Sequence, residues 1–320
     1  MRRRILMTAL LFIACTFSLT ASAREAKQPT PIGWIYVKSG SLTLLPRMGP
    51  IKGKASKVLQ GTLVPVFDLK EKGGAKWARV RTLSLAAAAL QDGWVDSTET
   101  TLLPPEAYPP DAELLKLVGG AYLDDITAAH ISIARFLVPQ GPGAPLLLCY
   151  LYGSGLPTAK LVAFAPSQGK YVLGPALDFP ASEMNAGITS LEIRDLVGDS
   201  RGCIMTHEPF GAGPETHGVN VVIRRIEDDR FLTVWEAPID SHSLSAFKPK
   251  VEILQPPEKN IGAPGTVTTG EVTFRPRANQ QDLVWKGKVE FFVFGREKAV
   301  DSVNIEKVCT WDGKEFTPLR

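Results

Sequence analysis

The chain is poor in the residues that most often carry chemistry. Its 320 residues include four cysteines and four histidines, and no two cysteines have the CxxC spacing of a zinc or redox site. The HExxH pattern, which places two zinc-binding histidines on one helical face, does not occur. Neither a GxSxG turn around a nucleophilic serine nor a glycine-rich phosphate loop is present. The sequence therefore lacks the usual signatures of zinc proteases, serine hydrolases and nucleotide-binding enzymes.

Long apolar segments are also scarce. The run Ile5–Leu19 is shorter than the roughly 20 residues of a membrane-spanning helix, and no second run approaches that length. It follows the cationic segment Arg2–Arg4 and precedes Ala21–Ala23, which has the small-x-small form of a signal cleavage site. We predict a secretory signal at residues 1–23. The mature protein is then exported, periplasmic or extracellular, and has no transmembrane anchor.

A second processing route starts at Cys15. Residues 12–15, Phe-Ile-Ala-Cys, are a poor version of the lipoprotein box, which usually has leucine in place of Phe12. The minor alternative is therefore a lipoprotein anchored through Cys15. In the other interpretation Cys15 is simply part of the apolar core of the signal.

The mature chain has no excess of charge. The precursor has 36 Lys+Arg and 33 Asp+Glu, and the signal removes three arginines and no acid, which leaves 33 cations and 33 anions. A neutral chain without a basic stripe lacks the electrostatic footprint of proteins that bind nucleic acid or anionic membranes. We predict no nucleic-acid partner.

Three cysteines remain after the signal is removed. Cys149, Cys203 and Cys309 lie in the apolar runs LLLCYLY, GCIMT and EKVCTW. An odd count permits at most one disulfide, and the sequence does not show which pair would form it. We interpret all three as small buried hydrophobic residues.

The rest of the sequence predicts mostly β structure. From Gly33 to Leu103, strands of about five residues alternate with Gly, Pro and Asp turns, which is typical of a small barrel. The Pro-rich segment 104–112 predicts an extended linker. Asp111 is an N-cap candidate for a short helix that reaches Val118 and stops at Gly119–Gly120.

The predicted fold class is mostly β. We expect a small SH3-like barrel at 24–103 and a β-repeat domain at 113–320, propeller-like or sandwich-like, with one short helix at its start. The apolar insertion LSLAAAAL at 83–90 fits a short helix or an interface flap, but a strand extension or covered loop is the favoured interpretation.

Several short motifs in the barrel region follow one another in a known order. Ser41–Leu45 with Gly49–Pro50, Gly61–Thr62, Trp77–Val80 and Gly93–Val95 resemble the successive elements of bacterial SH3-like (SH3b) domains. Two features depart from that family: Leu-Thr-Leu-Leu replaces the usual Leu-Asn-Val-Arg, and the apolar insertion precedes the closing strand.

The resemblance implies a targeting module that binds peptidoglycan or peptides. Four aromatic residues would then be candidates for the ligand groove: Trp34, Tyr36, Trp77 and Trp94. Because a barrel this small needs large core residues, we expect Trp77 and Trp94 to be core, and Trp34 and Tyr36 to be surface contacts.

The second region repeats a strand–turn–strand pattern. Gln168–Tyr171, Asp228–Phe231 and Asp312–Phe316 are equivalent hairpin turns, and each has further strands upstream, which gives three units of about four strands. The segment Trp311–Phe316 resembles the final element of FG-GAP/VCBS-type β-propeller repeats. Three units are fewer than the about four to eight blades of a closed propeller, so a degenerate fourth blade or a sandwich-like stack remains open.

Residues 188–208 form a strand, an acidic turn and a second strand that resemble a calcium-loop hairpin of such repeats. Asp195 and Asp199 remain as candidate ligands, but Val197 and Ser200 occupy positions that the loop needs for an oxygen ligand and a glycine. We interpret the segment as a structural turn and predict no cofactor, calcium included.

A second metal candidate surrounds the loop at 211–218. It consists of His207, Glu208, Glu215 and His217. An exposed polar loop is the favoured interpretation.

The sequence supports three hypotheses about function. The first is a non-catalytic exported protein of the cell envelope, with a ligand-binding barrel and a repeat domain for binding or scaffolding. The alternative is a wall-targeted envelope hydrolase with its active site in the C-terminal domain. The third is a purely structural or secretion-accessory protein whose barrel binds no wall.

Overall fold

The computed structural model describes most of the chain after the predicted signal. The described residues are 30–38, 40–49, 55–87, 89–122, 131–153, 156, 158–179, 187–211, 216–243, 265–292 and 298–319. The predicted signal, with Cys15, lies outside them. The chain divides into two compact units, residues 1–30 and 31–320, and all the elements below belong to the second.

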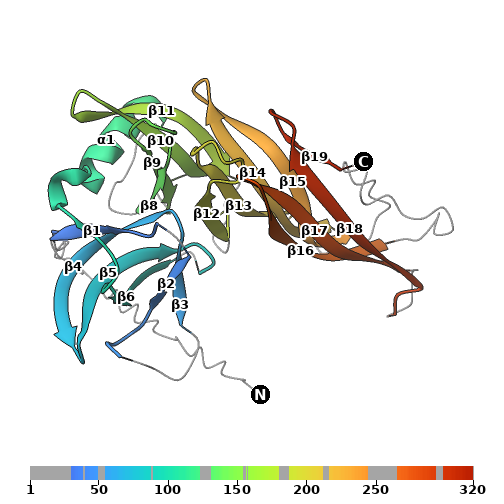
Figure 1. Ribbon diagram of the computed structural model, residues 1–320, viewed down its shortest axis with the longest axis horizontal. Helices are drawn as coiled ribbons and strands as arrows, with labels where there is room; N and C mark the ends of the chain where they lie inside the picture. Colours follow the sequence, from blue (N-terminus) through green and yellow to red (C-terminus); the bar gives the residue numbers. More distant parts are fainter. Residues whose placement is uncertain are drawn as a thin grey trace, which may run out of the picture. The chain divides into compact units, whose positions relative to one another are not determined.

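The prediction of a mostly β protein with one short helix is confirmed for the described chain (Figure 1). The first sheet has nine strands: β1 (Gly33–Tyr36), β4 (Thr62–Lys72), β5 (Ala75–Ser84), β6 (Ala89–Asp96), β7 (Leu102–Leu103), β8 (Ser132–Val138), β9 (Leu146–Tyr152), β10 (Ala159–Ser167) and β11 (Lys170–Phe179). Their order is β11-β10-β9-β8-β4-β1-β7, and β5 and β6 branch from β4. A separate pair consists of β2 (Ser41–Leu44) and β3 (Ser56–Leu59).

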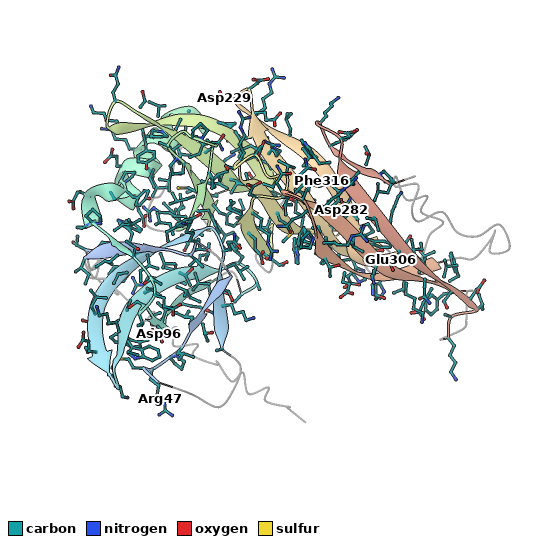
Figure 2. All side chains as sticks on the ribbon, in the orientation of Figure 1. Arg47, Asp96, Asp229, Asp282, Glu306 and Phe316 are labelled. Atoms are coloured by element: carbon teal, nitrogen blue, oxygen red, sulfur yellow. The ribbon has the colours of Figure 1, made fainter. Side chains whose placement is uncertain are left out.

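The second sheet is an antiparallel meander of eight strands in chain order. They are β12 (Ser190–Arg194), β13 (Cys203–Phe210), β14 (Thr216–Glu227), β15 (Arg230–Ser243), β16 (Gly265–Arg277), β17 (Gln280–Phe292), β18 (Asp301–Trp311) and β19 (Phe316–Pro318). The predicted turn at Asp228–Asp229 joins β14 to β15, and Asp229 lies at its tip (Figure 2). Both residues have positive φ, as a two-residue hairpin turn matching the strand twist requires.

The strands form three groups of four, β8–β11, β12–β15 and β16–β19, but no group is a sheet of its own. Residues 240–243 of β15 pair with 266–269 of β16, which joins the second group to the third. Thr62 and Leu63 of β4 pair with β8, which joins the first group to the strands of the region predicted as a barrel, β1–β7, called the barrel below. One sheet therefore continues across the linker at 104–112, whereas each blade of a propeller is a sheet of its own.

The bend of β4 explains how it belongs to both parts. Leu63–Val66 pair with β1, and from Val66 to Lys72 the strand pairs with β5. The register shifts between Val66 and Asp68, and such a bulge bends a strand. The insertion at 83–90 lengthens the hairpin of β5 and β6, as expected for a strand extension: Leu83 pairs with Leu90.

The linker and the helix differ from their prediction in two details. A 3-10 turn, η1 (Pro105–Ala107), interrupts the linker, and α1 spans Asp111–Tyr122. The prediction that Gly119–Gly120 ends the helix is wrong, because glycine costs a helix only about 1 kcal/mol and the helix continues through both residues. The buried side chains Leu114, Leu115 and Val118 hold it against the core.

Strands β8–β10 are apolar on both faces, which accounts for the unbroken run LLLCYLY in β9. On one face, Leu147 and Cys149 pack with α1 and the barrel residue Trp34. On the other, Leu148 and Tyr150 pack with residues of β12 and β13. A third core lies within the second sheet, and the barrel has its own small core.

Candidate functional site

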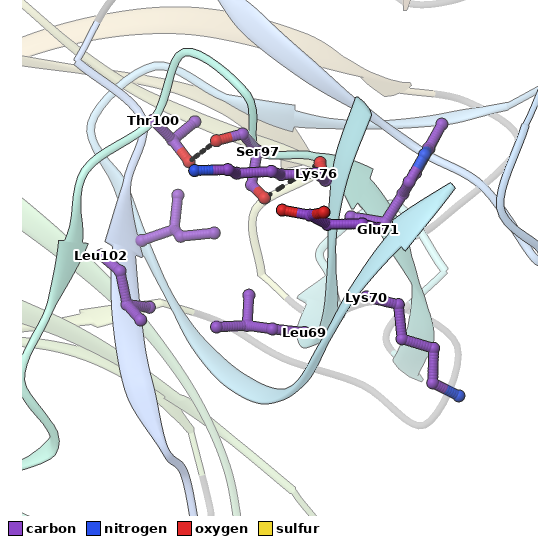
Figure 3. A pocket seen from close by; sticks show the side chains of 9 residues that line it. Leu69, Lys70, Glu71, Lys76, Ser97, Thr100 and Leu102 are labelled. Carbon is purple, nitrogen blue, oxygen red and sulfur yellow. Dashed lines mark hydrogen bonds between the residues drawn. The ribbon is translucent and has the colours of Figure 1, made fainter. Parts of the chain in front are cut away.

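A pocket of about 380 Å³ lies at one end of the barrel strands (Figure 3). Its lining comes from four elements and one turn: Ile35 of β1, Leu69, Lys70 and Glu71 of β4, Lys76 and Trp77 of β5, Leu102 of β7, and Ser97 and Thr100 of the turn after β6. We take this pocket as the candidate binding site, because ligand sites are concave, largely apolar and have few polar groups.

Regular pairing positions the walls of the pocket. Ile35 and Leu102 are directly opposite each other in the β1–β7 pair, and Glu71 is opposite Lys76 in the β4–β5 hairpin. The hairpin closes through Gly73–Gly74, both with positive φ, which glycine adopts without steric cost.

Hydrogen bonds fix the turn that forms the remaining wall. The backbone N–H and the Oγ of Ser97 donate to the Lys76 carbonyl at 2.8 and 3.1 Å. The Oγ1 of Thr100 donates to the Ser97 carbonyl at 3.0 Å. Asp96 accepts bonds from the Oγ1 and backbone N–H of Thr98, which lower the pKa of its carboxyl group. The turn is therefore held rigidly against the start of β5.

The floor of the pocket is apolar and partly open to solvent. Ile35 and Trp77 are buried, whereas Leu69 and Leu102 are 44% and 41% exposed. They are two of eight large hydrophobic residues exposed in the described chain, and both line this one pocket. A ligand that covers them gains the free energy of removing apolar surface from water.

The rim carries opposite charges. The ammonium group of Lys70 pairs with Asp68 at 3.3 Å and lies 5.3 Å from the centre of the Trp94 ring. Glu71 and Lys76 have no ion pair among the described residues, although they face each other across the hairpin. One carboxylate and one ammonium group are thus available to a ligand at the pocket mouth.

Of the four predicted aromatic contacts, Trp77 alone lines this pocket. The expectation that Trp34 lies on the surface is wrong, because Trp34 is 3% exposed. Its Nε1 donates to the Pro105 carbonyl at 3.0 Å, and the Arg135 guanidinium lies 4.7 Å from the centre of its ring. No local pattern in the sequence indicates that the barrel packs on the linker and helix.

The other two aromatic candidates, Tyr36 and Trp94, are partly exposed to solvent. Tyr36 is half-buried, and burial raises the pKa of its hydroxyl. Trp77 is buried, as expected for a core residue, and Trp94 is half-buried. Sequence reasoning missed Leu69, Leu102 and the facing Glu71–Lys76 pair; the Gly73–Gly74 turn was the signal that could have revealed the last of these.

The acidic turn after β12 is held by its own aspartates. Asp195 accepts hydrogen bonds from the backbone N–H groups of Gly198 and Ser200 at 2.7 and 2.9 Å. Asp199 accepts one from the Arg201 N–H at 3.0 Å and one from the Arg225 guanidinium at 2.6 Å. The carboxylates that could have bound calcium thus organise the turn.

The second metal candidate is dispersed. His207 lies on β13, where burial lowers the pKa of its imidazole, and Glu208 forms an ion pair with Arg224. The His217 ring stacks on His242, with 4.8 Å between ring centres. Glu215 lies outside the described residues. Among those that are described, no three His, Cys, Asp or Glu side chains are grouped as metal ligands.

The interpretation of the cysteines as buried hydrophobic residues is confirmed. Cys149, Cys203 and Cys309 are all buried free thiols. Burial raises the pKa of Cys149 to about 12 and that of Cys203 to about 11. Because the thiolate is the nucleophile, both groups are unreactive thiols at neutral pH.

Comparisons with protein-family models, with curated protein sequences and with solved structures found no significant match. Within the described residues, no helix has the length and apolar character to cross a membrane.

Proposed function

We propose that this chain is a non-catalytic, exported protein of the cell envelope whose SH3-like barrel binds peptidoglycan or a peptide. The observation that carries the proposal is the pocket beside Trp77, where exposed leucines lie next to an unpaired carboxylate and ammonium group. The export and the envelope location rest on the signal-like residues 1–23.

The ligand class follows from the chemistry of the pocket. Peptides and the peptide stems of peptidoglycan carry aliphatic side chains beside both ammonium and carboxylate groups. Leu69 and Leu102 suit the aliphatic parts, while Glu71 and Lys76 suit charges of opposite sign. An uncharged sugar would leave both charges of the rim without a partner.

The strands outside the barrel suit a scaffold. Barrel, helix and first sheet share one apolar core, and the second sheet packs on that sheet through β12 and β13. The pocket is therefore presented by a large supporting structure, in which the eight-stranded sheet serves binding or assembly.

The proposal is tested by retention of the mature chain, residues 24–320, on purified peptidoglycan. We expect retention of the wild type and a loss of about tenfold in affinity for Leu69→Asn with Leu102→Asn, because two apolar contacts of the pocket are removed. Leu232→Asn is the matched control, since Leu232 is 40% exposed on β15 and does not line the pocket. Equal retention of all three proteins, or of none, would contradict the proposal.

A further inference from the structure

A second concave site lies between the barrel and the second sheet. This groove has a volume of about 260 Å³. One side consists of β3 and the end of the β5–β6 hairpin, including the insertion residues Leu83–Ala86. The other consists of β8 and the start of β12, at Thr189–Leu191. None of its lining residues lines the pocket beside Trp77.

Two strand edges face this groove. Within the described chain, β3 pairs only with β2, and β12 is the last strand of its sheet, paired with β13 alone. An edge strand presents backbone N–H and C=O groups that another extended segment can pair with. Two strands that each pair on one side only within the described chain thus contribute to the lining of the groove.

The two strands meet at one point. The Ile193 N–H donates to the Gln60 carbonyl, just beyond β3, at 3.2 Å. Gly61 follows with a φ of +87°, and a Cβ at this position would lie 2.5 Å from the Cβ of Ile193. Upstream of this contact in the chain, Ser56–Leu59 and Thr189–Leu191 both line the groove.

The side chains of the groove are mostly uncharged. Of the sixteen lining residues, eight are apolar, seven carry a hydroxyl or amide group, and Lys57 alone is charged. Lys57 is exposed and has no ion pair among the described residues. A lining of hydroxyl groups and aliphatic side chains suits a polypeptide backbone, and the single cation suits one carboxylate.

We propose that this groove binds an extended peptide segment of a partner protein, which adds as a strand to the β12 or β3 edge and places a carboxylate on Lys57. Strand addition derives its affinity from main-chain hydrogen bonds and its specificity from pockets for alternate side chains. The half-buried residues Leu59 and Leu85 and the exposed Ala86 provide such contacts. A volume below that of most small-molecule sites fits the side chains of a few residues of an extended chain.

The test is a selection of displayed peptides of about six residues, the length of an average strand, on the immobilised mature chain. One library has free carboxyl termini and the other has internal peptides. We expect enrichment of β-branched sequences that carry an acidic side chain or a free carboxyl terminus. Failure to enrich any sequence above an empty support would overturn the proposal.

Two variants locate the binding of an enriched peptide. Lys57→Glu reverses the one charge and should weaken binding by about tenfold. Ala86→Trp fills the groove from an exposed turn residue and should abolish binding. Lys116→Glu on α1 is the matched charge control, because Lys116 is exposed and lies outside the lining. Binding that survives both groove variants, or that Lys116→Glu weakens equally, would overturn the proposal; thermal melting confirms that each variant is folded.

Discussion

Trp34 illustrates how one residue joins the barrel to the rest of the fold. Its indole donates to a linker carbonyl, its ring lies under Arg135, and Tyr108 meets it edge-on with 5.9 Å between ring centres. Arg135 is itself buried and forms an ion pair with Asp111, the first residue of α1. One aromatic side chain of β1 thus contacts the linker directly, and β8 and the helix through Arg135.

Substitution of Trp34 should be costly. Trp34→Ala removes a fully packed indole, and we expect a loss of about 3–5 kcal/mol in the free energy of unfolding, measured with urea. Trp34→Phe keeps a ring but loses the bond to the Pro105 carbonyl, which costs about 1–3 kcal/mol when that carbonyl stays buried. A surface role for Trp34 would instead predict less than about 0.5 kcal/mol for either change.

The thiols provide a second test at this scale. In the folded mature chain we expect Cys149, Cys203 and Cys309 to resist a thiol reagent at pH 8, because burial keeps them protonated and covered. In urea all three should react. A count of one reactive thiol after unfolding would show that a disulfide exists and would contradict the described free thiols.

The ion pair of Asp92 with Arg81 makes the stability of the fold depend on pH. The Arg81 guanidinium donates two hydrogen bonds to it, at 2.8 and 2.9 Å, and these hold the pKa of the Asp92 carboxyl below its usual range. A lowered pKa in the folded state stabilises the fold above the unfolded value of about 3.9 and loses that effect as the pH falls through the folded pKa.

We therefore expect Asp92→Asn to destabilise the protein slightly at pH 7, by up to about 1 kcal/mol because the pair is partly exposed. The difference from the wild type should shrink as the pH falls below 4. Urea titrations at pH 7 and pH 3 measure it. An equal difference at both values would mean that the ion pair contributes nothing.

At the scale of the element, the acidic turn at 195–200 connects the β12–β13 hairpin to β14 and to the β16–β17 hairpin. Asp195 folds the turn on itself, Asp199 attaches it to Arg225 of β14, and the Leu196 carbonyl accepts a bond from Gln281 of β17. A Cβ on Gly198 would overlap the backbone of Asn279 in the β16–β17 turn, and the φ of Gly198 is +73°. The turn between β12 and β13 thus contacts both β14 and the β16–β17 hairpin.

Because protein contacts hold this turn, we expect a substitution in it to lower the stability of the fold, and we expect calcium to leave that stability unchanged. Gly198→Ala should cost about 1–3 kcal/mol, since alanine is strained at positive φ and must displace Asn279. Melting of the wild type should show the same midpoint with calcium and with chelator, because binding to the native state alone would raise it. A midpoint that rises with calcium and no longer does so in Asp195→Ala would assign the turn a ligand role.

Sequence patterns predicted the strands better than they predicted which strands pair with each other. Alternating and unbroken apolar runs, with turns such as Gln168–Gly169 and Asp228–Asp229, gave the strands of β10–β11 and β14–β15, because these signals are local. Pairing between strands distant in sequence has no such signal. Nothing near Thr62 indicates that it pairs with Phe136, and nothing near Gly61 indicates that Ile193 lies against it.

The same limit explains the candidate site. Trp77 was recognised as an aromatic candidate, but Leu69 and Leu102 become neighbours only when β7 pairs with β1. The sequence predicts Trp34 as a groove residue because a barrel considered alone leaves it without a partner. The helix that shares its core begins more than seventy residues later in the chain.

At the scale of the whole molecule, the barrel is not an independent domain of the described chain. Leu63 and Trp34 share a core with α1, β9 and β10, and β4 pairs with β8. We expect residues 24–103 alone to be unfolded by circular dichroism and NMR, because they lack these partners. The mature chain should unfold in one cooperative transition by both probes. A folded fragment, or two separate transitions, would contradict the shared core.

We propose that the pocket beside Trp77 binds a peptide stem, and this binding can be followed residue by residue. The most direct test is NMR titration of the labelled mature chain with a soluble stem peptide of peptidoglycan. We expect saturable shifts at Leu69–Glu71, at Trp77 and at Ser97–Leu102, and their loss in the variant with Asn at 69 and 102. Shifts confined to other residues, or no shifts at millimolar peptide, would contradict it.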